Sequence, residues 1–303
     1  EVMRNRFFAI TEEMGAALIR TAYSTNIKDR RDCSCALFDV NGETIAQAEH
    51  IPVHSGVLPW GVKGALKHIN KKELKPGDAI MHNDPFIGGT HLPDIIIFSP
   101  IFFKGELVAF VGNLAHHVDV GGKVPGSLTP DATEIFHEGI CFPPVKIKKE
   151  GKVDPEIFAM FRSNIRTKYE SSGDLMAQIA ANNVGEKRFE ELCDEMGVEV
   201  VLEAIAELEN YCDRRMGAEL EKLPKGTFEF EDFLEGDGIT TTEPLKIKVT
   251  ITTGGPHIKI DFTGTGKRTF ELCSSDGVGL HLLCCSSSDG SHDSTEFWNI
   301  SPL

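Results

Sequence analysis

The pattern of apolar residues changes at Pro143-Pro144, and this change constrains the fold more than any other feature. Before it, short apolar runs are separated by Gly-containing turns, which predicts β-hairpins at 34–38 with 44–48 and at 95–103 with 106–114. After it, apolar residues recur at three- and four-residue steps, which predicts helices at 154–163, 172–196 and 199–223. Strand-like patterns return at 227–235 and 245–262. The sequence therefore predicts an α+β fold.

The remaining segments complete the expected layout. Residues 1–25 and 56–70 read as helices, 79–82 as a strand, and 118–143 as a long Gly- and Pro-rich loop of the kind that is often functional. We expect a β-rich metal-site domain, a helical insert and an incomplete second β-rich domain. Their expected bounds are 1–150 for the α+β metal-site domain, 151–223 for the helical segment, 224–266 for the start of the β-rich domain, and 267–303 for an atypical, poorly ordered tail.

Composition and charge exclude several classes of protein. The net charge of −15 argues against nucleic acid and anionic membranes as partners. No apolar run approaches the roughly 20 residues of a membrane-spanning helix, and charges within residues 1–20 interrupt any signal peptide. We therefore expect a cytoplasmic protein whose eight cysteines are free thiols rather than a disulfide framework or a zinc knuckle.

Polar residues with metal-binding chemistry lie in segments rich in Gly and Pro. His91 and Asp94 stand three apart in a turn that directly follows the strand expected at 79–82. His116-His117 ends another expected strand, and Asp32 precedes the first hairpin. Because these turns have few residues that can fill a core, the polar side chains are candidates for a site.

Imidazole and carboxylate groups together suit Zn²⁺, Mn²⁺ or Fe²⁺, and a catalytic metal site uses three or four such ligands. Asp32, His91, Asp94 and one of His116 or His117 supply that set. Adjacent strand residues point to opposite faces, so the two histidines should not both bind one ion. The alternative interpretation is that these residues only hydrogen-bond loops together, and His50 and His54 fit either a pocket or ordinary loops. The candidates for acid, base or supporting roles are His117, Asp119 and Glu134.

At these residues the chain resembles the hydantoinase B family, which includes the carboxy-terminal part of 5-oxoprolinase and the large subunit of acetone carboxylase. The resemblance is carried, in family order over residues 1–195, by RNRFFAITEEMGAALIRTAYSTNIKDRRDCSCALFD, AQAEHIPVHSG, PGDAIMHNDPFIGGTHLPD, AHHVDVGGKVPGS, ATEIFHEGICFPPVKI and SNIRTKYESSGDLMAQIAANNVGEKRFEEL, and DFTGTG at 261–266 continues it. It implies metal ligation by Asp32, His91, Asp94 and His116. The choice of His116 over His117 rests on the resemblance alone.

The resemblance also implies a function. The expected protein is a metal-dependent subunit of an ATP-dependent cyclic-amide hydrolase of the hydantoinase or 5-oxoprolinase type, which acts on a substrate phosphorylated by a partner of the hydantoinase A type. ATP would be used by that partner, since this chain has no complete phosphate loop. Two alternatives stay open: the large subunit of an acetone-type carboxylase, and a truncated, inactive family member, because residues 267–303 do not resemble the family sequence beyond DFTGTG.

Overall fold

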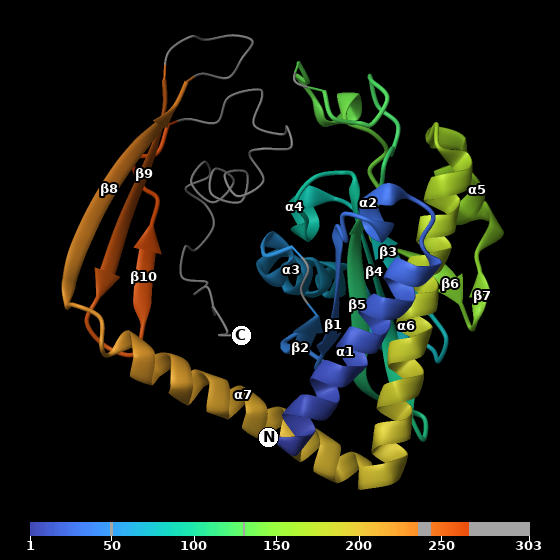
Figure 1. Cartoon of the computed structure of the whole chain (residues 1–303), viewed down its shortest axis with the longest axis horizontal. Coiled ribbons are helices and arrows are strands. Elements are labelled where there is room, and N and C mark those ends of the chain that lie inside the picture. The colour runs from blue at the N-terminus through green and yellow to red at the C-terminus, as the bar shows by residue number, and fades with distance from the viewer. Residues whose placement is uncertain (49–50, 130, 236–243, 267–303) are drawn as a thin grey trace. The chain divides into compact units, whose positions relative to one another are not determined.

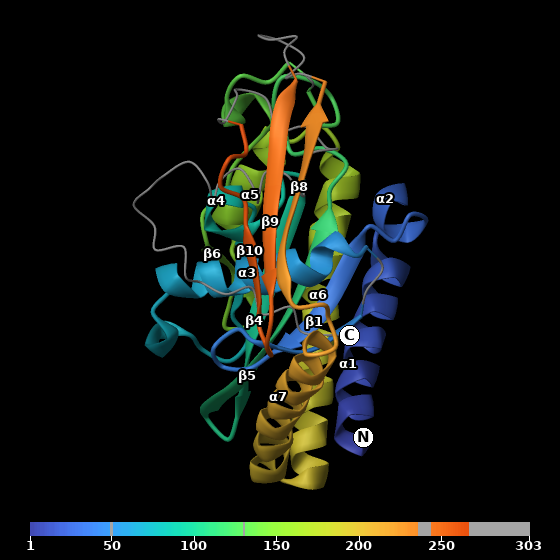
Figure 2. The same cartoon turned by 90° about the vertical axis from the view of Figure 1, so that its left-hand side faces the viewer.

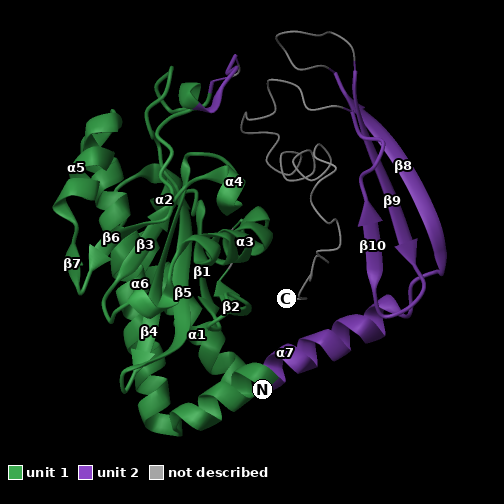
Figure 3. Ribbon diagram, turned by 180° about the vertical axis from the view of Figure 1, so that it is seen from behind, with its two compact units in different colours: residues 1–128, 136–206 green, residues 129–135, 207–303 purple. Residues whose placement is uncertain are grey.

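The computed structural model describes residues 1–48, 51–129, 131–235 and 244–266 (Figure 1). The chain divides into two compact units, one of residues 1–128 and 136–206 and the other of residues 129–135 and 207–303 (Figure 3). The expectation for the tail at 267–303 and the candidate residue His50 lie outside the described residues.

The first unit is built on a seven-stranded sheet in which every neighbouring pair is antiparallel. Its strand order is β2-β1-β5-β4-β3-β6-β7. The two predicted hairpins are confirmed, and they lie side by side in the sheet because β1 pairs with β5. The strands are β1 (Cys33–Phe38), β2 (Thr44–Ala48), β3 (Ala79–His82), β4 (Asp94–Phe103), β5 (Glu106–His116), β6 (Val145–Lys149) and β7 (Lys152–Val153).

Two long helices cover one face of this sheet. The helix α1 (Val2–Thr21) packs along α6 (Lys168–Met196), and α6 in turn contacts β4 and β5, as Figures 1 and 2 show. Close contact is possible because Gly185 has no side chain: a Cβ there would lie 2.4 Å from the sulfur of Met14 and 2.8 Å from Val111. Shorter elements connect or flank these helices: α2 (Thr25–Lys28), η1 (Lys71–Glu73), η2 (Ile135–His137) and α5 (Pro155–Asn164).

The opposite face of the sheet is covered by α3 (Val53–His68) and the short α4 (Pro85–Gly88). A Cβ added to Gly61 of α3 would lie 2.3 Å from the side chain of Ile96 and 2.7 Å from the carbonyl oxygen of Gly88. The sheet is therefore buried on both faces, which explains why its central strands are apolar along their whole length.

The boundary between the units differs from the expected domain bounds. The helical residues 151–223 do not form a unit of their own, because α6 buries one side against the sheet and belongs to the first unit. The division falls at residues 206 and 207, within α7 (Val198–Leu220). No described helix is both long enough and apolar enough to cross a membrane.

The second unit contains an antiparallel sheet in the order β10-β9-β8. Its strands are β8 (Gly226–Leu234), β9 (Leu245–Thr253) and β10 (Ile258–Asp261). The pairing register gathers Phe228, Phe230, Val249 and Ile251 on one face. Glu229 and Glu231, on the other face, form ion pairs with lysines of β9. This amphipathic pattern confirms the predicted β-rich start of a second unit.

Ahead of β3, the buried carboxylate of Asp78 anchors the turn to β6. It accepts hydrogen bonds from the Lys146 ammonium at 2.7 Å, the Lys75 amide at 3.0 Å and the Glu150 amide at 2.9 Å. Burial opposes ionisation of this carboxyl, but these partners outweigh burial and hold its pKa below the ordinary value. The ionised form of Asp78 is therefore the form that stabilises the fold.

We expect Asp78→Asn to lower the free energy of unfolding at neutral pH by about 1.5–3 kcal/mol, the usual contribution of hydrogen bonds to a charged group. Because the folded pKa is below the unfolded one, this stabilisation is complete above the unfolded pKa near 4 and is lost as pH falls through the folded pKa. Urea denaturation at several pH values should show the two proteins converging in acid. The exposed Asp29→Asn serves as the control, and a gap between wild type and Asp78→Asn that widens in acid would contradict the assignment.

Candidate metal centre

The sheet topology brings three distant parts of the sequence to one edge. The end of β5 pairs with the beginning of β1 on one side and with the beginning of β4 on the other, so that Asp94 lies opposite His116. The backbone amide of His116 donates to the carbonyl of Asp32 at 3.0 Å, which places Asp32 at the same edge. The four residues expected to bind a metal therefore meet here because the strands are antiparallel, although the sequence separates them widely.

Their side chains form a compact cluster. Nδ1 of His116 lies 3.1 Å from Oδ1 of Asp94, and Nδ1 of His91 lies 3.2 Å from Oδ2 of the same residue. The two imidazole rings are tilted, with centroids 4.9 Å apart. Asp94 and His91 are buried, whereas His116 is partly accessible. One carboxylate thus faces two imidazoles at an edge that is open to small molecules at His116.

Asp32 and His54 extend this cluster. Oδ2 of Asp32 lies 4.0 Å from Nδ1 of His116, and its Oδ1 lies 3.7 Å from Nε2 of His54. His54 is buried in the first turn of α3, and its Nδ1 pairs with the hydroxyl of Ser34 at 3.1 Å. The sequence left the role of His54 open, and the structure places it beside the cluster rather than in an ordinary loop.

The loop before β4 is organised by its own polar residues. The Asn83 side chain donates to the carbonyl of Leu92 at 2.7 Å and accepts from the Phe142 amide at 2.6 Å, which closes the loop across its base. Asp84 caps the N-terminus of α4 by accepting from the Phe86 amide. Of the two carboxylates in this segment, Asp84 is therefore used for capping, and Asp94 is the one presented to the histidines.

Thr90 is a site residue that sequence reasoning missed. Its hydroxyl donates to Oδ2 of Asp94 and also lies 3.3 Å from Nδ1 of His91. A hydroxyl in this position orients the carboxylate between the imidazoles. The only signal in the sequence is its place next to His91, where Thr is also common as a turn residue.

The electrostatics of the cluster favour an ionised carboxylate. Burial opposes ionisation of Asp94, but the charges of and hydrogen bonds from His91 and His116 outweigh it and hold its pKa well below the usual range. Burial likewise opposes charging of His91, and Asp94 overcomes that effect and raises the His91 pKa. Burial lowers the pKa of His54, against the attraction of the two carboxylates. A buried anion with adjacent imidazoles is an arrangement that can hold a cation.

The donor set fits a divalent transition metal. His91, Asp94 and His116 each offer a ligand atom, and these atoms all lie within 4.8 Å of one another. Two imidazole nitrogens and a carboxylate oxygen, with Asp32 as a further oxygen donor, match the mixed preference of Zn²⁺, Mn²⁺ and Fe²⁺. Cysteine sulfur is absent from this set, and the described cysteines are free thiols.

His117 points away from this cluster. Its side chain lies on the α6 face of the sheet, fully buried, with Nε2 2.9 Å from Oε1 of Gln178 and its ring at right angles to Phe161. Burial lowers its pKa. Of the two adjacent histidines it is therefore His116 that joins the cluster. The suggested acid or base role of His117 does not agree with its position behind the sheet, where it meets Gln178 instead of the cluster.

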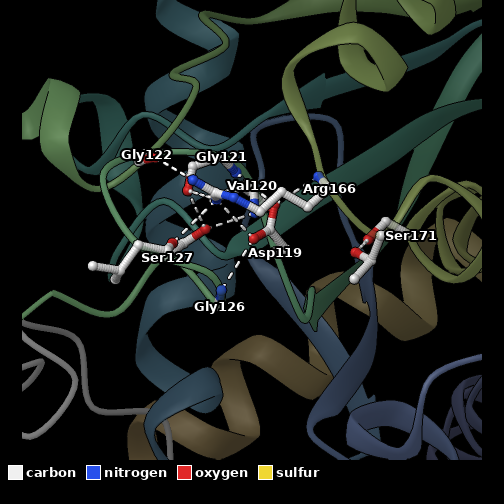
Figure 4. Close-up of polar contacts among 10 residues, drawn as sticks. Asp119, Val120, Gly121, Gly122, Gly126, Ser127, Arg166 and Ser171 are labelled. Atoms are coloured by element: carbon white, nitrogen blue, oxygen red, sulfur yellow. Dashed lines mark hydrogen bonds and ion pairs between the residues drawn. The ribbon is translucent and has the colours of Figure 1, made fainter.

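Asp119 organises the loop that follows β5 (Figure 4). Its two oxygens accept hydrogen bonds from the amides of Gly121 and Gly126, both at 3.0 Å, and from the backbone and guanidinium of Arg166 at 2.9 and 3.0 Å. Burial opposes ionisation, but these donors lower its pKa. The guanidinium also donates to three loop carbonyls. Four accepted hydrogen bonds leave Asp119 a structural anchor, and the expected catalytic role is not supported.

Glu134 lies outside the first unit. It is exposed and belongs to residues 129–135, which group with the second unit. The structure does not bring it together with His91, Asp94 and His116, so its catalytic role stays a prediction.

Comparison with known proteins accounts for this arrangement. The sequence model of the Hydantoinase B/oxoprolinase family matches residues 1–275. The chain belongs to this family. It is 35% identical, over 84% of its length, to the B subunit of a putative D-/L-hydantoinase from a Pseudomonas species, strain NS671.

Solved structures of similar fold cover most of the chain. The crystal structure of an ATP-dependent caprolactamase from Pseudomonas jessenii matches 95% of it with a TM-score of 0.83 and 32% identity. A nucleotide-free acetone carboxylase matches 89% of it with a TM-score of 0.81 at 20% identity, a likeness that shows the fold alone. The chain spans 44% of the hydantoinase relative and 50% of the caprolactamase chain, about half the length of these family members.

Proposed function

We propose that this chain is the metal-binding part of a subunit of an ATP-dependent cyclic-amide hydrolase. The observation that carries the proposal is the cluster of His91, Asp94 and His116, with Asp32 beside it, at the sheet edge. The caprolactamase likeness supports the cyclic amide as substrate class, since caprolactam is a lactam and the match covers nearly the whole chain. The substrate of this chain is thus proposed to be a lactam or cyclic imide.

In this proposal Asp94 and the two histidines hold Zn²⁺, Mn²⁺ or Fe²⁺, with Asp32 as a fourth ligand. The bound ion would act as a Lewis acid toward a carbonyl oxygen and lower the pKa of a water molecule. Thr90 keeps the Asp94 carboxylate turned toward the histidines. His54, buried and hydrogen-bonded to Ser34, is placed to hold Asp32 in position.

ATP is proposed to be used by a partner subunit of the hydantoinase A type. The relatives are named as subunits of larger enzymes, and the solved caprolactamase is described as ATP-dependent. This chain contains Gly264-Thr265-Gly266-Lys267 but lacks the full spacing of a phosphate loop. The acetone carboxylase likeness does not favour a carboxylase, because it is a likeness of fold only.

The isolated chain is expected to show no ATP binding by calorimetry and no ATP hydrolysis with lactams or hydantoins. ATP hydrolysis coupled to ring opening should appear when the complete subunit is combined with a hydantoinase A-type partner, and Asp94→Asn should abolish the ring opening. Micromolar affinity of this chain alone for ATP would overturn the division of labour. Ring opening that survives Asp94→Asn would overturn the site.

A further inference from the structure

The carboxamide of Gln178 bridges the two strands that carry the candidate metal ligands, from the opposite face of the sheet. Gln178 lies in α6 and is fully buried. Its Nε2 donates to the carbonyl of Ile95 at 2.8 Å, and its Oε1 lies 2.9 Å from Nε2 of His117. Ile95 directly follows Asp94 in β4, and His117 directly follows His116 at the end of β5.

These bonds determine which atom donates at each contact. Because a carbonyl can only accept, the amino group of the Gln178 carboxamide must face Ile95. Its oxygen therefore faces His117, whose Nε2 must carry the proton. The ring of His117 is thereby held in one orientation. The backbone amide of His117 also donates to the carbonyl of Pro93 at 2.9 Å, so the same residue is tied to the loop before β4.

The position of Gln178 matters because the β4–β5 ladder ends at this point. Asp94 pairs with His116, and both strands give way to loops beyond this pair. The last pair of a ladder has neighbours on one side only, so it is the pair most prone to local opening. Metal ligands need their geometry held within a fraction of an ångström. A buried carboxamide that bonds to the residue after each ligand holds this pair closed.

We propose that Gln178 is a positioning residue for the metal ligands Asp94 and His116, which it touches only through Ile95 and His117. The inference rests on the metal site proposed above. It differs from a purely structural role because it predicts that the loss of Gln178 weakens metal binding in a protein that is still folded.

The chain supplies a matched control one helical turn away. Asn182 is also fully buried in α6, and its carboxamide donates to the carbonyl of Ile97 at 3.1 Å and accepts from the Asn113 side chain at 2.7 Å. It therefore makes the same kind of bond to β4 and β5, but two residues farther from the end of the ladder. A merely structural role predicts similar consequences for both residues.

The experiment compares Gln178→Met and Asn182→Leu, which keep volume and remove the carboxamide. Both should lower the urea midpoint. Zn²⁺ affinity, measured by competition with a chromophoric chelator, should fall by roughly 10–100-fold in Gln178→Met, the usual cost of losing a residue that orients a ligand. In Asn182→Leu it should stay within about 3-fold of wild type. Equal affinities in the two variants would overturn the proposal, whereas a wild-type chain without Zn²⁺, Mn²⁺ or Fe²⁺ affinity would overturn the metal site itself.

A measurement on the wild type covers the case in which Gln178→Met does not fold. If the bonds of Gln178 favour metal binding, then bound metal must stabilise those bonds to the same extent. Hydrogen exchange of the Gln178 side-chain amide, followed by NMR, should therefore slow on addition of Zn²⁺, while that of Asn182 should change little. An exchange rate of the Gln178 amide that is the same with and without bound Zn²⁺ would contradict the inference.

Discussion

Asp94→Asn is expected to lower the affinity for Zn²⁺, Mn²⁺ or Fe²⁺ by more than about 100-fold, since loss of a residue that merely orients a ligand already costs roughly 10–100-fold. The reason lies in the geometry of the cluster, where the Asp94 carboxylate faces His91 at 3.2 Å and His116 at 3.1 Å. Asparagine keeps the shape of the side chain but removes the negative charge that a cation needs. Metal content after dialysis, measured by mass spectrometry, and chelator competition provide the readout.

The control for this variant is Asp84→Asn in the same loop. Asp84 caps α4 by accepting from the Phe86 amide, and asparagine caps helices about as well as aspartate. Asp84→Asn should therefore bind metal like the wild type. The assignment of the cluster fails if folded wild-type chain contains no transition metal, or if Asp94→Asn retains the full amount.

Gly64→Ala should destabilise the first unit strongly. A Cβ at Gly64 in α3 would lie 1.9 Å from the carbonyl oxygen of Ile87 in α4, so the backbone of one helix must move. Overpacking usually costs about 1–3 kcal/mol, and we expect a loss of free energy of unfolding at or above the upper end of that range. Because α4 leads into Thr90 and His91, the displacement should also loosen the cluster.

Gly56→Ala in the same helix provides a control of opposite sign. Gly56 is exposed, and a Cβ there would meet no atom within 4 Å. Alanine is a better helix former than glycine, so this variant should gain roughly 0.5–1 kcal/mol. Urea denaturation of both variants tests the packing of α3 on α4, and a Gly64→Ala protein as stable as wild type would show that the two helices are not in close contact.

Much of the secondary structure could be predicted from the sequence because it is encoded in short stretches. The Asn41-Gly42 turn and the alternation around Lys104-Gly105 predicted hairpins that the structure confirms. The ligand candidates could also be selected by chemistry, since imidazoles and carboxylates in Gly- and Pro-rich turns do not fill a core. The polar residues Gln178 and Asn182 could have been noticed as well, because they recur at the spacing of the buried side of α6.

Only the tertiary structure decided what these residues meet. The sequence predicted that His116 and His117 face opposite ways, but which of them joins Asp94 depends on the register of β4 and β5. It did not reveal that Asp119 is fully engaged with Arg166, nor that α6 belongs to the same unit as the sheet. The physical reason is range. Turns and periodicity depend on neighbours a few residues away, whereas strand order, register and helix packing join segments far apart in the chain, and no local pattern records those distances.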